Sequence, residues 1–182
     1  MKRVAVFILL VLVNTSLLAD TLTVRLEAIA PISGRVRGAE RSRILFAFPL
    51  PERVRQSRID FAQLQFPPVQ IRDTSYHFTI EGYLLTTAWE TRSVTWTRPW
   101  RNPGGDFDSA RICRFTTAVT DSHPVILDIT QAVKRWQESG NNLGLILKRP
   151  EYEGDGFGIE ALPLRQVLNS ARVRFYFTPV QE

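Results

Sequence analysis

Strict alternation of apolar and polar residues is the feature that most constrains how this chain folds. Over residues 21–29 the side chains at even positions are apolar, and those between them are Thr, Arg or Glu until Ile29 closes the segment. The same period of two recurs over 76–84 and over 171–178. Because successive side chains of a strand point to opposite faces of a sheet, these segments predict half-buried β-strands.

Five shorter segments complete the predicted set of strands. Residues 44–48 form a nearly continuous apolar run that Pro49 ends, which is typical of a strand covered on both faces. Over 59–66 the alternation changes phase between Phe61 and Ala62, and this indicates a β-bulge. The remaining predicted strands are 92–96, 125–127 and 143–149.

One segment has the period of a helix instead. Its apolar residues recur at i, i+3, i+4 and i+7 and form one stripe: Ile129, Ala132, Val133 and Trp136. Asp128 or Thr130 can cap the first turn, and Gly140 suits the left-handed position that ends many helices. A single short helix among about eight strands predicts an all-β domain, an antiparallel β-sandwich of the jelly-roll kind whose helix closes one end.

The first 19 residues differ from the rest and predict export. Two basic residues precede an apolar run over 4–13, and small and polar residues follow it up to Ala19. This is the order of regions in a secretory signal peptide. A run of about ten apolar residues is half of what a membrane-spanning helix needs. We therefore expect cleavage near Ala19 and a single domain over 20–182 that is secreted, periplasmic or part of the cell envelope, with no remaining membrane span.

Composition argues against several classes of function. The formal net charge is +5, and it falls to 5 − 2 = +3 without residues 1–19. This positive excess is small for a nucleic-acid-binding protein. The lone Cys113 lies in a strand-like stretch, so we expect a buried thiol and no internal disulfide. His77 and His123 lie far apart in the sequence and show no metal-ligand spacing, so a catalytic triad would rest entirely on tertiary contacts. We therefore expect that the protein is not an enzyme.

Three blocks of sequence follow one another along the chain. The first joins the arginine-led segment 42–51 to residues 59–66, the second runs from the paired tryptophans to a glycine-rich acidic segment over 89–108, and the third covers 127–148. Together they resemble the DNRLRE family, extracellular β-sandwich domains related to carbohydrate-binding modules, some of which recognise alginate-like polysaccharide. The resemblance implies a non-catalytic, carbohydrate-binding domain. The family's proline-led motif before the last strand is replaced here by residues 169–173.

A polysaccharide site needs aromatic rings on which the flat C–H faces of sugars can lie. Trp100, Phe107 and Tyr152 lie among polar residues and are the predicted sugar-contacting rings. Arg98 and Arg101 flank Trp100, where their guanidinium groups can pair with the anionic groups of a uronic acid or sulfated polymer. The other tryptophans, at positions 89, 96 and 136, are predicted to be structural.

Oxygen ligands for calcium are a separate expectation. Asp106 and Asp108 follow Gly104 and Gly105, and a flexible acidic loop can wrap a calcium ion. The alternative is that glycine and aspartate simply form turns there.

Two classes of function stay open at this point. The first is an exported, non-catalytic domain that binds an acidic polysaccharide outside the cell or at its surface. The second is a structural or adhesive domain of the cell envelope with no sugar site. A glycosidase or polysaccharide lyase ranks third, because any acidic surface contains carboxylate pairs of the kind that glycosidases need.

Overall fold

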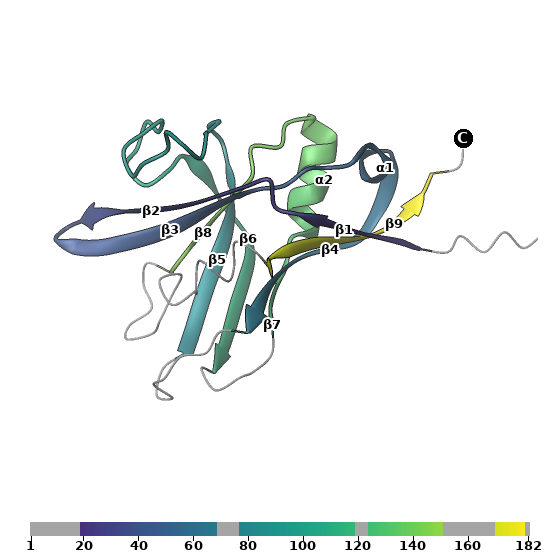
Figure 1. Cartoon of the computed structure of the whole chain (residues 1–182), viewed down its shortest axis with the longest axis horizontal. Helices are drawn as coiled ribbons and strands as arrows, with labels where there is room; N and C mark the ends of the chain where they lie inside the picture. The colour runs from purple at the N-terminus through teal and green to yellow at the C-terminus, as the bar shows by residue number, and fades with distance from the viewer. Residues whose placement is uncertain (1–18, 69–76, 119–123, 151–169, 181–182) are drawn as a thin grey trace, which may run out of the picture.

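The computed structural model describes residues 19–68, 77–118, 124–150 and 170–180. Within these ranges the chain forms nine strands and two short helices. The strands belong to two sheets in which every neighbouring pair is antiparallel (Figure 1). The predicted all-β sandwich is therefore confirmed.

The two sheets are built from strands that are far apart in the sequence. The four-stranded sheet has the order β1 (Asp20–Arg25), β9 (Arg172–Pro179), β4 (Ser57–Pro68) and β7 (Pro124–Asp128). The five-stranded sheet has the order β2 (Ala28–Val36), β3 (Ala39–Ala47), β8 (Leu145–Lys148), β5 (His77–Leu85) and β6 (Phe107–Ala118).

The inner core lies between the sheets and consists of the alternate side chains that the period of two predicts. Phe46 and Phe66 face each other across it, with ring centroids 5.4 Å apart. On β9 the inward residues are Val173, Phe175 and Phe177, as expected, and all three are fully buried. Cys113 belongs to the same core, and burial raises the pKa of its thiol to about 12.

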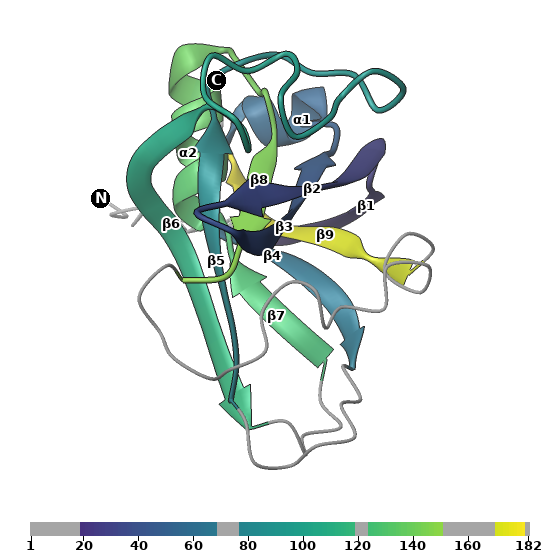
Figure 2. The same ribbon diagram turned by 90° about the vertical axis from the view of Figure 1, so that its left-hand side faces the viewer.

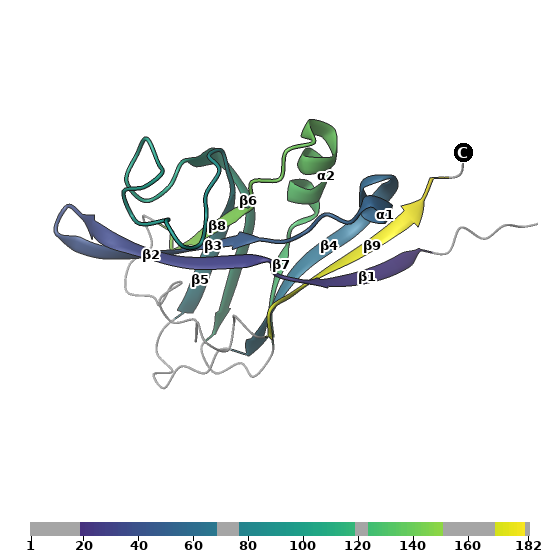
Figure 3. The same ribbon diagram turned by 45° about the horizontal axis from the view of Figure 1, so that its top comes forward.

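Helix α2 (Thr130–Ser139) covers one end of the sandwich, and α1 (Glu52–Arg55) lies on the same side of the molecule (Figure 3). The predicted apolar stripe is buried, and Trp136 contacts Phe48 edge-on at 5.3 Å. The helix ends at Gly140, which has a φ of 67°. Neither helix in the described ranges has the length and apolar character needed to span a membrane.

A second apolar cluster, here called the outer cluster, lies on the other face of the five-stranded sheet. The sheet contributes Ala30, Ile32, Leu45, Tyr83, Leu85 and Ile146 to it. The loop 86–106 joins β5 to β6 and lies over the end of the sheet formed by β2 and β3 (Figures 1 and 2). Its Trp96 and Trp100 cover these side chains. The five-stranded sheet is therefore covered on both faces.

Two expected strands differ from the structure. Residues 21–29 form two strands, because the chain leaves the four-stranded sheet at Arg25 and enters the other sheet at Ala28 without a break in the alternation. Residues 92–96 form an irregular loop, and the N–H of Val94 donates to the carbonyl of Glu90 at 3.0 Å. The apolar residues of this loop alternate because they face the outer cluster, although no strand is present.

Bulges explain two further differences. The predicted bulge in β4 is confirmed, although its register shift lies between Ile59 and Phe61 and not after Phe61. The predicted set lacks β6 altogether, and the pairing of β6 with β5 shifts register on both sides of Tyr83. As a result Ile112 and Cys113, which are consecutive, both contact the inner core, and no simple period of two is visible.

Candidate functional site

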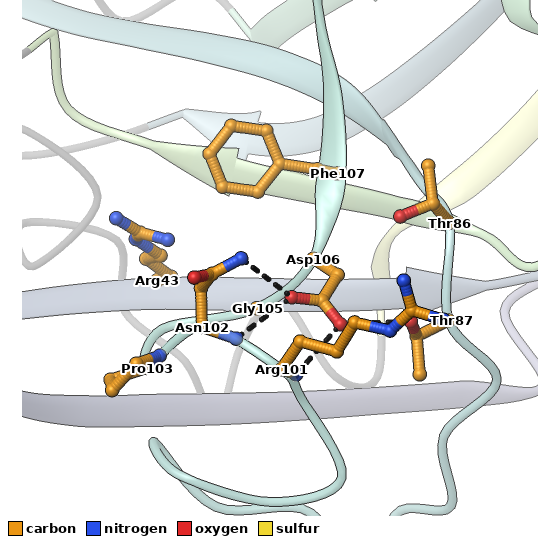
Figure 4. A pocket seen from close by; sticks show the side chains of 9 residues that line it. All are labelled: Arg43, Thr86, Thr87, Arg101, Asn102, Pro103, Gly105, Asp106 and Phe107. Atoms are coloured by element: carbon orange, nitrogen blue, oxygen red, sulfur yellow. Dashed lines mark hydrogen bonds between the residues drawn. The ribbon is translucent and has the colours of Figure 1, made fainter.

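A hollow of about 540 Å³ opens at the edge of the loop 86–106, where this loop meets β3 and the start of β6 (Figure 4). We call it the first hollow. It is lined by Arg43, Thr86, Thr87, Arg101, Asn102, Pro103, Gly105, Asp106 and Phe107. Arg101 is exposed to solvent, whereas Phe107 is half-buried.

Asp106 holds the end of the loop in place. Its carboxylate accepts the backbone N–H groups of Arg101 at 2.9 Å and Asn102 at 3.0 Å, and the hydroxyl of Thr87 at 3.0 Å (Figure 4). Burial on its own raises the pKa of Asp106, but these hydrogen bonds outweigh it and leave the pKa below its ordinary value. The ionised carboxylate therefore fixes the backbone from which Arg101 and Asn102 project.

Two glycines let this loop approach the sheet closely. Gly104 and Gly105 have φ values of 94° and 109°, which residues other than glycine rarely adopt. A Cβ at Gly104 would lie 2.8 Å from Nη1 of Arg43, and one at Gly105 would lie 2.9 Å from Cδ1 of Ile146. In the native structure Nη1 of Arg43 donates to the carbonyl of Gly104 at 2.6 Å.

Two cationic side chains lie near the ring of Phe107. The Arg43 guanidinium is 5.3 Å from the centroid of its ring, and Nζ of Lys148 lies at the same distance. Arg43 also lies 5.0 Å from the ring of Trp96, and Lys148 lies 5.0 Å from the ring of Tyr83. These cation–π contacts anchor basic groups at the boundary between the outer cluster and the hollow.

A row of charged residues continues from Arg43 across the sheet. Register partners connect Arg43 to Lys148, Lys148 to Glu81, and Glu81 to Arg114. Glu81 is buried, and it accepts hydrogen bonds of 2.7 Å from the Tyr83 hydroxyl and from Nη1 of Arg111. Burial alone raises the pKa of Glu81, but these donors and the charge of Arg114 lower it further than burial raises it. The row carries more cations than anions.

The structure brings together three of the residues predicted for a site. Arg101, Asp106 and Phe107 all line the first hollow, although Phe107 begins β6 and does not lie in a loop. Arg98 is exposed and does not line the hollow. Tyr152 and residues 1–18 of the predicted signal peptide lie outside the described residues.

The expectation that Trp100 offers its ring to a sugar is wrong. Only 7% of Trp100 is exposed, and its ring belongs to the outer cluster. Its Nε1–H donates to the carbonyl of Thr95 at 2.9 Å, which satisfies the one polar group of the side chain. The ring is buried because it shields the sheet, as Trp96 does beside it.

The predicted calcium ligands also have other partners. The oxygens of Asp106 are taken by the donors described above, and Asp108 accepts the N–H of Ala110 at 2.9 Å and pairs with Arg135 at 2.8 Å. Calcium requires six to eight oxygen ligands, as a rule. In the part of the chain that the structure describes, no three acidic, histidine or cysteine side chains gather at one point. Among the described residues, Asp106 and Asp108 therefore do not fit a calcium site.

Sequence reasoning missed Arg43, Asn102 and Thr87 as lining residues. Arg43 carries a detectable signal, because it precedes the apolar run Ile44–Phe46 on a strand whose two faces are both covered. Asn102 and Thr87 carry none, since their place in the hollow depends on hydrogen bonds to Asp106.

No family model matches the chain, and no curated protein is significantly similar to it. The resemblance to the DNRLRE family therefore stays a prediction from the sequence.

Proposed function

We propose that this protein is exported and that its β-sandwich binds an acidic polysaccharide in the first hollow, without catalysing a reaction. The observation that carries the proposal is the carboxylate of Asp106, which holds Arg101 and Asn102 beside the ring of Phe107. Cationic, amide and aromatic groups thus meet in one open hollow of about 540 Å³.

The groups of the hollow suit an anionic sugar. The planar guanidinium of Arg101 can donate two parallel hydrogen bonds to a carboxylate or sulfate. The amide of Asn102 can bond hydroxyl groups, and an aromatic ring such as Phe107 offers an apolar surface to the C–H groups of a pyranose. These residue types are the polar and aromatic groups that ligand hollows combine.

The charge of the hollow favours an anion. Asp106 is the only acidic residue among those that line it, and its charge is already satisfied by four N–H and O–H donors. Arg43 and Arg101 add two positive charges at the same place. Because the loop is already fixed by Asp106, binding requires little further ordering of the backbone, and such pre-organisation favours affinity.

The sequence supports the biological setting of this proposal. Residues 1–19 have the order of regions of a signal peptide, and the three sequence blocks resemble an extracellular family related to carbohydrate-binding modules. A domain exported in this way would meet polysaccharides of the cell envelope or of the surroundings.

Affinity electrophoresis and calorimetry test the proposal. We expect the purified protein to be retarded by an acidic polymer such as alginate and not by neutral dextran. Arg101→Ala should weaken binding by about ten- to hundredfold, since a hydrogen bond to a charged group contributes about 1.5–3 kcal/mol. Arg92→Ala is the matched control, because Arg92 is exposed in the same loop and does not line the hollow.

Two outcomes would contradict the proposal. One is equal retardation by neutral and acidic polymers, and the other is binding that Arg101→Ala and Arg92→Ala weaken equally. Absence of binding to every anionic polymer, with capture of an envelope protein by the same preparation, would favour a structural or adhesive role instead.

A further inference from the structure

A second hollow, of about 560 Å³, adjoins the first. It is lined by Leu84, Leu85, Thr86, Asp108, Arg135, Trp136, Glu138, Ser139, Asn141 and Leu143. Thr86 lines both hollows, and its N–H donates to the carbonyl of Asp106 at 3.0 Å. The two hollows also share one stretch of chain, since Asp106 and Phe107 line the first hollow and the next residue, Asp108, lines the second.

The second hollow has an apolar floor. This floor consists of the buried side chains of Leu84 and Trp136 from the inner core and of Leu85 from the outer cluster. Half-buried Leu143 packs against the outer cluster and also lines the hollow. Its rim is polar and includes Ser139 and Asn141 near the end of α2, both of them exposed. An apolar floor with a few hydrogen-bonding groups at the rim is the usual composition of a ligand site.

The charge of the second hollow differs from that of the first. Its one basic residue, Arg135, is paired with Asp108 at 2.8 Å. Glu138 adds a second carboxylate at the exposed rim. A carboxylate of a ligand would therefore meet repulsion here, whereas it meets Arg43 and Arg101 in the first hollow.

We propose that the two hollows are adjacent subsites for one heteropolysaccharide, in which an acidic sugar in the first hollow is followed by a neutral, N-acylated sugar in the second. This inference rests on the proposed function. The methyl of an acetamido group suits the floor of Leu85 and Leu143, and the amide and ring hydroxyls suit Asn141. Glu138 discriminates against a second acidic sugar, so the preferred ligand is a mixed polymer and not a polyuronate.

Calorimetry with defined oligosaccharides tests the inference. One ligand is a hexasaccharide in which glucuronate alternates with N-acetylglucosamine, and the other is an oligouronate of equal length. We expect the alternating ligand to bind about tenfold more tightly, a difference that corresponds to about 1.4 kcal/mol.

Glu138→Arg tests the assignment of the second hollow. This variant places a cation at the rim, so we expect about fivefold tighter binding of the oligouronate, because a like-charge contact is replaced by an opposite-charge one. The ratio between the two ligands should shrink accordingly. Glu27→Arg is the control, because Glu27 is also exposed, undergoes the same charge change and lines neither hollow.

The outcomes separate this inference from the proposed function. If the oligouronate binds at least as tightly as the alternating ligand, or if Glu138→Arg and Glu27→Arg act alike, the second subsite is overturned. The first hollow then still stands, provided that Arg101→Ala weakens binding. If neither acidic ligand binds, both the proposed function and this inference fail.

Discussion

The inner and outer faces of the five-stranded sheet are both buried, but different kinds of structure cover them. The four-stranded sheet covers the inner face, and the apolar side chains of the two sheets pack against each other there. In the described ranges the loop 86–106 covers the outer face, and there a row formed by Arg43, Lys148 and Glu81 lies beside the apolar residues of the sheet.

The difference shows what each kind of cover allows. A sheet presents side chains at a fixed spacing, and a charge buried between two packed sheets is costly unless it is paired. A loop can bend its backbone and supply partners where charges need them, as the carbonyl of Gly104 does for Arg43. In this molecule the outer face therefore has both the charged groups and the first hollow, whereas the inner face provides the stability.

The largest effect is expected on the inner face. Phe175→Ala removes a fully buried ring and should lower the free energy of unfolding by about 3–5 kcal/mol. Tyr176→Ala is the matched control, because Tyr176 is the next residue of β9 and is only half-buried. Denaturant unfolding followed by circular dichroism measures both. Equal losses for the two variants would mean that the inner face does not dominate stability.

A smaller effect is expected where the loop contacts the sheet. A Cβ at Gly34 would lie 2.3 Å from Cγ of Trp96, so Gly34→Ala should push the loop away and cost about 1–3 kcal/mol. Tryptophan fluorescence and affinity for an acidic polymer should change with it. Ser33→Ala, at the exposed neighbouring position, should leave the free energy of unfolding, the fluorescence and the affinity unchanged. Unchanged fluorescence in Gly34→Ala would show that the loop is not seated on Gly34.

The charged groups of the outer face make a third contribution, which depends on pH. The pKa of Glu81 is lowered in the folded protein, so its stabilising effect is complete above the unfolded pKa, near 4.3, and is lost as the pH falls through the folded pKa. Glu81→Gln should lower the free energy of unfolding by about 1–2 kcal/mol at pH 7 and by less at pH 3. Unfolding measured across this range tests the sign. A loss that is the same at every pH would exclude the ionised pair as its cause.

The smallest effect on stability concerns Cys113. Its thiol packs on Gly82 in the inner core, and Cys113→Ala should cost about 1 kcal/mol. The informative measurement is the rate at which a thiol reagent labels Cys113 in the folded protein. Labelling should be very slow, because the thiol is buried and its pKa is about 12. If Gly34→Ala accelerates labelling by more than its loss of stability explains, then the two faces open together and are not independent.

The sequence predicts the inner face well because one physical rule generates it. Alternating side chains define β4, β5 and β9, and the helical stripe around Trp136 defines α2. The same rule fails at Arg25, where the alternation runs on through a change of sheet.

The outer face is harder to predict, because its contacts depend on the tertiary structure. Trp100 lies among polar residues in the sequence, yet its ring is buried by a fold of the loop that no local period indicates. Arg101, Asp106 and Phe107 could be selected by residue type and position. Arg43 joins them only because β3 passes beneath Gly104, which lies 61 residues further along the chain.

The pairing of β1 with β9 has a mechanical consequence. Asp20, at the start of β1, is the register partner of Phe177, near the end of β9, so both ends of the sandwich emerge at one point of the same ladder. Tension applied through these ends would peel β1 from β9 one rung at a time and would not slide the strands past each other. The domain would then yield first at this ladder under load, while the first hollow, in the loop on the side of the molecule away from the C-terminus (Figures 1 and 3), would still be intact.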